Sequence, residues 1–222
     1  MATNPGTIAA FVELCYLATW HSTMYLFFNY FIDTHCIVGK SLVFRKANLD
    51  KLGGFKKYSN YLAEDLFVAK DFWKAKWPSK IAPDPSIQNL GNITLSEYWM
   101  RQERWTRLRF SAQPGPTFLE VFTHIFINGM LSYHAMSTIL GIPPSQYLWI
   151  HFAIWLFTDT LQFCLFHGFN PVTLVKFLGA WALRELLALP LLLVAAQGDT
   201  VLWRGKYYKI AEASLLTNTK RD

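Results

Sequence analysis

Three long apolar stretches, at residues 118–140, 148–166 and 178–196, occupy the second half of the chain. Each is close to the roughly 20 residues that a helix needs to cross the hydrocarbon core of a bilayer. Segments rich in Gly and Pro, at 141–145 and 168–171, separate them and are typical of turns. The pattern predicts three transmembrane helices. The alternative is a soluble all-helical core, but soluble helices of this length seldom lack a charged stripe.

Ionisable residues lie at or inside these stretches. An unpaired charge in hydrocarbon costs from about 2.5 kcal/mol upward. We therefore expect Asp159 and the adjacent Arg184 and Glu185 to face one another, a cavity or the soluble part of the protein. Glu120 lies near the start of the first stretch, so we expect it to reach water from a helix end. Pro190 should kink the third helix.

The first half has a different pattern. Residues 8–32 are aromatic and amphipathic, but Glu13, His21 and Asn29 argue against a membrane span. They predict a helix or strand that lies on the lipid surface. Residues 36–46 contain a short β-prone run.

Helix signals follow further along. Residues 61–77 predict a helix that Pro78 ends, and residues 81–89 predict an extended segment. Thr94 and Glu97 have the spacing of a capping box, in which the threonine hydroxyl and the glutamate carboxylate bind first-turn amides. A helix should therefore begin directly after Thr94.

Composition supports a membrane protein with a basic soluble part. Of the 222 residues, 52% are hydrophobic and 16% are charged, where soluble domains average about 25% charged. The net charge is +6, and 14 of the 21 Lys and Arg residues lie between Lys40 and Arg109. This part should face phosphates, a nucleotide or an anionic leaflet. Three irregularly spaced cysteines indicate neither a disulfide framework nor a zinc site.

Two groups of residues suggest chemistry. Glu64 and Asp65 lie at the predicted start of a helix, where the helix N-terminus keeps a carboxylate ionised and suited to act as a base. A plain helix cap is the alternative. Arg101, Arg104 and Trp105 share one face of the next helix, where a guanidinium could clamp phosphate and the indole could stack on a sugar. A cationic helix that holds anionic lipid is the alternative.

In combination these motifs are more specific. A Glu-Asp pair, an Arg-x-x-Arg-Trp run roughly 35 residues later, and then membrane helices resemble the membrane-bound inverting glycosyltransferases with a GT-A lobe. Within that group the chain resembles the ceramide glucosyltransferase family, over about residues 8–210. Further matching residues are Cys36 to Ser41, Arg45-Lys46, Leu49-Asp50, Gly53-Gly54, Tyr61 to Asp65, Gln88-Asn89, Arg184-Glu185, Trp203-Arg204 and Tyr207.

The resemblance implies transfer of glucose from UDP-glucose to the primary hydroxyl of ceramide, with inversion, by a multi-pass Golgi membrane enzyme whose catalytic lobe is cytosolic. The partners it implies are UDP-glucose, ceramide and the lipid bilayer, without nucleic acid and with self-association left open. It implies these roles for residues of this chain: Asp65 as the general base with Glu64 as the second candidate, and Arg101, Arg104, Trp105, Cys36 and His21 as substrate-binding residues.

The chain also departs from the family pattern. Family members use Mg²⁺ or Mn²⁺ held by an upstream acidic D-x-D motif, and no Asp-x-Asp occurs in these 222 residues. No metal ligands are therefore expected here, and the chain should be a truncated form that lacks the donor-binding half. The expected fold is α/β plus membrane α-helices: the acceptor half of a GT-A lobe at 1–115, three transmembrane helices at 116–197 and a polar tail at 198–222.

Two other functions stay open. A processive polysaccharide synthase shares both motifs, but three helices are few for a polymer channel and Gln is more usual at the position of Arg101. A non-catalytic membrane protein that binds lipid or the full-length enzyme is favoured by the absent donor half.

Overall fold

The computed structural model describes residues 2–32, 36–84, 86–210 and 216–218. Its elements, in chain order, are β1 (Ala2–Pro5), α1 (Ile8–Tyr16), the π-helix η1 (Leu17–His21), α2 (Ser22–Tyr30), α3 (Lys46–Lys51), the 3-10 helix η2 (Phe55–Tyr58), α4 (Glu64–Lys74), β2 (Gln88–Gly91), α5 (Leu95–Ala112), α6 (Pro114–Leu119), the 3-10 helix η3 (Glu120–Thr123), α7 (Ile125–Leu140), α8 (Pro144–His167), α9 (Pro171–Ala196), β3 (Thr200–Trp203), β4 (Lys206–Ile210) and β5 (Leu216–Asn218).

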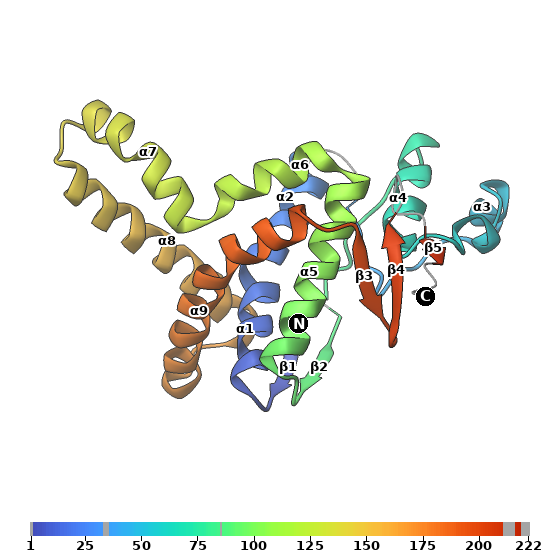
Figure 1. Cartoon of the computed structure of the whole chain (residues 1–222), viewed down its shortest axis with the longest axis horizontal. Helices are drawn as coiled ribbons and strands as arrows, with labels where there is room; N and C mark the ends of the chain where they lie inside the picture. Colours follow the sequence, from blue (N-terminus) through green and yellow to red (C-terminus); the bar gives the residue numbers. More distant parts are fainter. Residues whose placement is uncertain (1, 33–35, 85, 211–215, 219–222) are drawn as a thin grey trace.

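Helices α1, α5 and α9 pack side by side and form the core of the molecule (Figure 1). Ala10, Val12 and Cys15 of α1 are fully buried. The prediction that residues 8–32 lie on the lipid surface is therefore wrong for α1, whose small and apolar side chains fit between the two longer helices. Burial does not contradict the prediction for α2, because no residue of α2 is buried.

Helix α5 begins as the sequence predicts. The Thr94 hydroxyl accepts a hydrogen bond from the Glu97 amide at 3.2 Å, and the Glu97 carboxylate accepts one from the Thr94 amide at 2.7 Å. Both halves of the capping box are present, so two amides of the first turn are satisfied.

Two small sheets complete the fold. β1 and β2 pair in parallel, with Ala2 opposite Gln88 and Pro5 opposite Gly91, whereas β3, β4 and β5 form an antiparallel sheet. The expected polar tail thus carries three strands, and Val201 and Ile210 pack against Leu108 of α5. The strand predicted within 36–46 does not form. Its side chains stay without a partner strand, and Val43 is 94% exposed.

Two of the three predicted spans are confirmed as helices that are long and apolar enough to cross a bilayer, namely α8 and α9. At 1.5 Å per residue they measure about 36 and 39 Å, against about 30 Å of hydrocarbon. α9 continues through Pro190.

The predicted span over 118–140 is not confirmed as one helix, because the backbone is extended at His124 and separates η3 from α7. Glu120 does not reach water from a helix end. Its carboxylate binds the Arg109 guanidinium at 2.9 Å and so ties this turn to α5. The helix that remains, α7, has 16 residues and measures about 24 Å.

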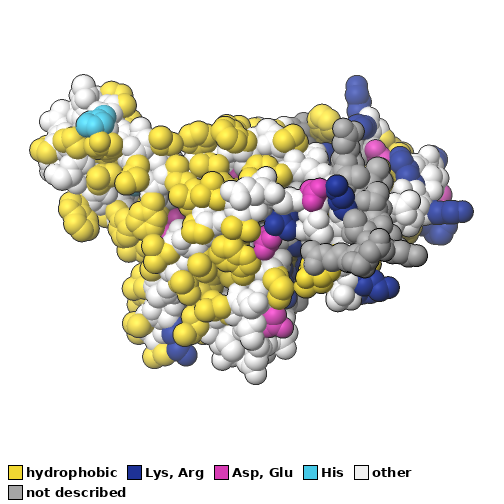
Figure 2. All heavy atoms as spheres, viewed as in Figure 1, with side chains coloured by type: hydrophobic (Ala, Val, Ile, Leu, Met, Phe, Trp, Pro, Cys, Tyr) yellow, Lys and Arg dark blue, Asp and Glu magenta, His cyan; other side chains and the backbone are white. Residues whose placement is uncertain are grey.

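Apolar and basic surfaces lie at different ends of the molecule. In Figure 2, hydrophobic side chains cover the side formed by α7, α8 and α9, while Lys and Arg gather at the end that holds α3, α4 and the antiparallel sheet. On α8, Trp149, Phe157 and Leu165 are 73%, 66% and 78% exposed. Such a large exposed apolar surface indicates contact with a membrane or another protein.

Candidate functional site

The start of α4 is held firmly by a small core. Leu49, Tyr58 and Val68 are buried together. Asp71, one turn further along α4, accepts hydrogen bonds from the Tyr58 hydroxyl at 2.7 Å and from the Lys57 ammonium at 2.5 Å. These contacts fix the direction of α4 and hence the position of the carboxylates in its first turn.

Asp65 is the better placed of the two predicted acidic residues. Its Oδ2 accepts a hydrogen bond from the Gly39 amide at 2.7 Å, and its Oδ1 accepts one from the Leu66 amide at 2.8 Å. These two donors and the helix N-terminus stabilise a charged carboxylate. Each oxygen keeps a further lone pair that can accept a substrate hydroxyl. Glu64 is exposed.

Gly39 is needed for this contact. A Cβ atom at this position would lie 3.0 Å from Oδ2 of Asp65 and 3.3 Å from its Cβ and Cγ. Any larger residue would therefore force the carboxylate or the loop to shift by a few tenths of an ångström.

Cys36 lies on the same loop. Burial, and secondarily the negative charge of Asp65, raise the pKa of its thiol to about 11. The thiol therefore stays protonated at neutral pH and is not a nucleophile. The Cys36 carbonyl accepts a hydrogen bond from the Asn29 amide at 2.7 Å, which ties the loop to α2.

Lys40 connects this loop to the second motif. Its ammonium lies 5.7 Å from the centre of the Trp105 ring and binds the side-chain oxygen of Gln88. Trp105 also packs against Tyr16, with 6.2 Å between ring centres. Adjacent residues of one loop, Gly39 and Lys40, thus contact Asp65 and Trp105, which are 40 positions apart in the sequence. The sequence reasoning missed this role of Lys40.

The two predicted arginines differ. The Arg101 guanidinium binds the carboxylate of Glu13 at 2.5 Å, and Glu13 is fully buried in α1. Arg104 is half-buried and forms no ion pair with any residue that the structure describes. Burial, and then the charge of Arg101, lower the pKa of Arg104. Arg104 is therefore the guanidinium available to a phosphate, while Arg101 holds α5 to α1.

Sequence reasoning treated Glu13 only as an interruption of an apolar run. The signal that could have identified its role is physical. A carboxylate in a helix that becomes fully buried needs a cation, because an unpaired buried charge is very costly.

His21, at the end of η1, lines a cavity of about 970 Å³. Burial, and then the charges of Lys40 and Arg109, lower the pKa of His21 to about 4, so its ring is neutral near pH 7. Lys40 lines the same cavity. The other predicted site residues, Cys36, Glu64, Asp65, Arg101, Arg104 and Trp105, do not line it.

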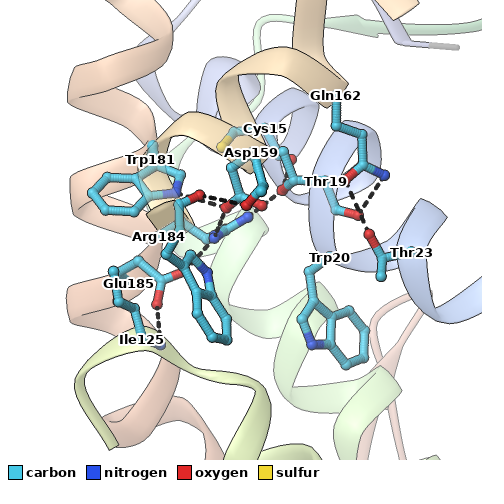
Figure 3. A network of polar contacts seen from close by, with 12 residues as sticks. Cys15, Thr19, Trp20, Thr23, Ile125, Asp159, Gln162, Trp181, Arg184 and Glu185 are labelled. Atoms are coloured by element: carbon cyan, nitrogen blue, oxygen red, sulfur yellow. Dashed lines mark hydrogen bonds and ion pairs between the residues drawn. The ribbon is translucent and has the colours of Figure 1, made fainter. Parts of the chain in front are cut away.

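A buried ionic network joins α8, α9 and η1 (Figure 3). The Arg184 guanidinium lies 2.9 Å from the Asp159 carboxylate and also binds Glu185. Trp181 donates to Asp159 at 2.7 Å, and Arg184 also donates to the Thr19 hydroxyl. The prediction that these charges face one another is confirmed. The pairing is what allows them to lie among apolar helices.

The residues present do not fit a divalent metal ion. Hard cations require several oxygen ligands, mainly carboxylates. Among the described parts of the chain, no group of three or more His, Cys, Asp or Glu residues could hold an ion. Glu64 and Asp65 are adjacent, but two carboxylates alone are too few ligands for such an ion.

Comparison with known proteins identifies the class. The profile of glycosyl transferase family 21 matches residues 1–216, so the chain belongs to that family. It is 28% identical to ceramide glucosyltransferase 3 of Caenorhabditis elegans, over 93% of this chain and 45% of the worm protein. It is 26% identical to ceramide glucosyltransferase 1 of the same organism, over 98% of this chain and 46% of that protein. It is 25% identical to ceramide glucosyltransferase of Komagataella phaffii, over 93% of this chain and 53% of the yeast protein.

The chain spans about half the length of the curated relatives that it matches. No solved structure is significantly similar to it.

Proposed function

We propose that this chain carries the acceptor side of a ceramide glucosyltransferase active site, which transfers glucose from UDP-glucose to the primary hydroxyl of ceramide. Family membership supports the reaction class. The observation that carries the assignment is the loop of residues 36–41, which brings Asp65 and Trp105 into one site through Gly39 and Lys40. Neither motif alone would distinguish a helix cap or a lipid-binding helix from a catalytic site.

In the proposed reaction, Asp65 accepts the proton of the acceptor hydroxyl as its oxygen bonds to the anomeric carbon of glucose. The bond from that carbon to the UDP oxygen breaks, and UDP leaves with the bonding electrons from the opposite face. The configuration at the anomeric carbon is therefore inverted. Arg104 stabilises the diphosphate, for which its planar guanidinium is suited. Trp105, held by Lys40 and Tyr16, provides a flat surface for the sugar.

The proposal places the enzyme in the Golgi membrane, with α7 and α8 crossing the bilayer as a pair and with the basic lobe and the turn at 168–170 on the cytosolic face. The apolar surface of α8 and the cluster of basic residues at the other end of the molecule support this arrangement (Figure 2). Relatives named as ceramide glucosyltransferases favour this reaction over polymer synthesis. We further propose that much of the donor site, including any metal ligands, lies outside the 222 residues.

A hybrid enzyme tests the proposal. The part of the worm ceramide glucosyltransferase 3 that aligns with this chain is replaced by this chain, and glucosylceramide formation from UDP-glucose and a short-chain ceramide is measured. We expect the hybrid to be active and Asp65→Asn to lower its turnover at least 100-fold, because an amide cannot accept the proton.

Glu64→Gln is the matched control, since Glu64 is the exposed neighbour of Asp65. It should retain most of the activity. A folded hybrid without activity, or an Asp65→Asn hybrid with normal turnover, would contradict the proposal.

A further inference from the structure

The cavity beside His21 is enclosed by parts of the chain that are far apart in the sequence. One wall is a face of η1 and α2 that includes Leu17, His21 and Leu26 at helical spacing. The loop at 37–45, part of α4 and residues 77–84, 86 and 88 form the other walls. A volume of about 970 Å³ is at the upper end of the range for small-molecule sites.

The cavity reaches the loop that contacts the proposed catalytic base. Ile37 and Val38 of this loop line it. They directly precede Gly39, whose amide donates a hydrogen bond to the Asp65 carboxylate. A ligand in the cavity therefore lies against the loop that positions the carboxylate.

The cavity also adjoins the apolar side of the molecule. Phe166 and His167, at the end of α8, line it. Next to them in the sequence, Leu165 of α8 and Phe169 of the following turn are 78% and 75% exposed, so exposed apolar side chains flank this part of the cavity wall. A hydrocarbon chain could thus pass from α8 into the cavity without exposure of its methylene groups to water, which is unfavourable.

We propose that this cavity binds the acceptor lipid, with its hydrocarbon chains against the wall formed by η1, α2 and Phe166 and its hydroxyl toward the loop at 36–40. The site rests on the proposed function. It places acceptor binding on α2, where residues such as Leu26 would determine which chains fit. An uncharged headgroup suits the polar residues near the loop, among them neutral His21 and the amide of Gln88.

Exposed Lys40, Arg45 and Lys80 also line the cavity. They make an anionic phospholipid the main competing occupant, which the experiment has to separate from an uncharged two-chain lipid.

The experiment uses the 222-residue protein in lipid nanodiscs and a ceramide that carries a diazirine on its acyl chain. After illumination, labelled peptides are mapped by mass spectrometry. We expect labels on α2 and around Phe166, reduced by excess unlabelled ceramide and not by phosphatidylserine. Labelling needs no turnover. An inactive hybrid enzyme with intact labelling would contradict the reaction and leave the lipid site standing.

Two neighbouring residues of α2 provide a matched pair of variants. Leu26 and Phe27 are 41% and 47% exposed, but only Leu26 lines the cavity. Leu26→Glu should lower labelling at least fivefold, and Phe27→Glu should leave it within twofold of the unchanged protein. Leu42→Glu, on the exposed loop side of the cavity, is a second variant that does not involve a helix.

Three results would overturn the proposal. Labels spread evenly over α7, α8 and α9 would indicate non-specific contact with membrane lipid. Equal labelling of the Leu26→Glu and Phe27→Glu proteins would exclude the cavity as the site. Stronger competition by phosphatidylserine than by ceramide would assign the cavity to an anionic lipid.

Discussion

The buried carboxylate of Glu13 makes Arg101 a structural residue where α5 packs on α1. Removal of one partner from a buried ion pair leaves an unpaired charge and typically costs about 3 to 5 kcal/mol. Arg101 is 28% exposed, so we expect Arg101→Met to lower the free energy of unfolding by about 3 kcal/mol, at the lower end of that range. Chemical denaturation in detergent, followed by circular dichroism, measures the change.

The Glu13→Gln/Arg101→Met double variant tests the cause. It removes both charges, so it should recover most of the loss that Arg101→Met alone produces. Lys46→Met breaks an exposed ion pair with Asp50 and should cost less than about 1 kcal/mol. An Arg101→Met protein as stable as the Lys46→Met protein would show that Glu13 does not depend on this cation.

Arg104 has the opposite role in the proposed site, because it is left available for the donor. Lysine keeps the positive charge but loses the planar pair of donors that matches a phosphate. In the hybrid enzyme, Arg104→Lys should raise the KM for UDP-glucose at least tenfold while leaving the KM for ceramide nearly unchanged. Arg204→Lys, an exposed change in the turn between β3 and β4, is the control. Equal donor KM values for both variants would favour a lipid-binding role for Arg104.

At the scale of elements, the loop at 36–41 is the feature that sequence periodicity missed. Its apolar run resembles a strand, but a strand forms only where a partner strand is available, and no local pattern encodes that partner. What the loop does instead is hold Asp65 through the Gly39 amide. The helices were easier to predict, since a capping box and long apolar runs are local signals. The stretch 118–140 does not form one helix because the backbone is extended at His124, and the contact between Glu120 and Arg109 just before it depends on how the helices pack.

Gly39→Ala tests this function of the loop. The added Cβ would lie 3.0 Å from Oδ2 of Asp65, so the carboxylate has to move. We expect kcat of the hybrid enzyme to fall at least tenfold with little change in thermal stability, because the loop is exposed at this point. Gly115→Ala is a suitable control, since a Cβ there meets no atom within 4 Å. Unchanged kcat in the Gly39→Ala enzyme would show that the contact with Gly39 does not position the base.

For the molecule as a whole, composition predicted the separation of an apolar side from a basic end, and Figure 2 shows it. It did not predict that α1 would be buried along α9, or that the C-terminal residues would return to pack on α5. Both depend on contacts between segments more than 90 positions apart, such as the one between Arg107 and the Thr200 carbonyl. The buried network around Arg184 could be predicted in part. The sequence shows that a charge inside an apolar helix needs a partner of opposite charge, but which residues come within reach of it depends on the fold.

The direction in which α8 crosses the membrane determines on which side of the bilayer the rest of the molecule lies. If α8 spans the membrane, the turns at its two ends, at 141–143 and 168–170, lie on opposite sides. The turn at 168–170 is followed by Lys176, whereas the other has no basic residue nearby, so the positive-inside rule places the turn at 168–170 in the cytosol. An N-glycosylation acceptor site inserted into the turn at 141–143 should therefore be modified in cells.

The same site inserted at 168–170 should stay unmodified, which a gel shift sensitive to endoglycosidase measures. The sequence already contains one acceptor site, at Asn92 with Thr94, and it serves as an internal control for the lobe. A cytosolic lobe leaves Asn92 unmodified. Modification of both inserted sites, or of neither, would show that α8 does not cross the bilayer, and its exposed apolar face would then have to be covered by another protein.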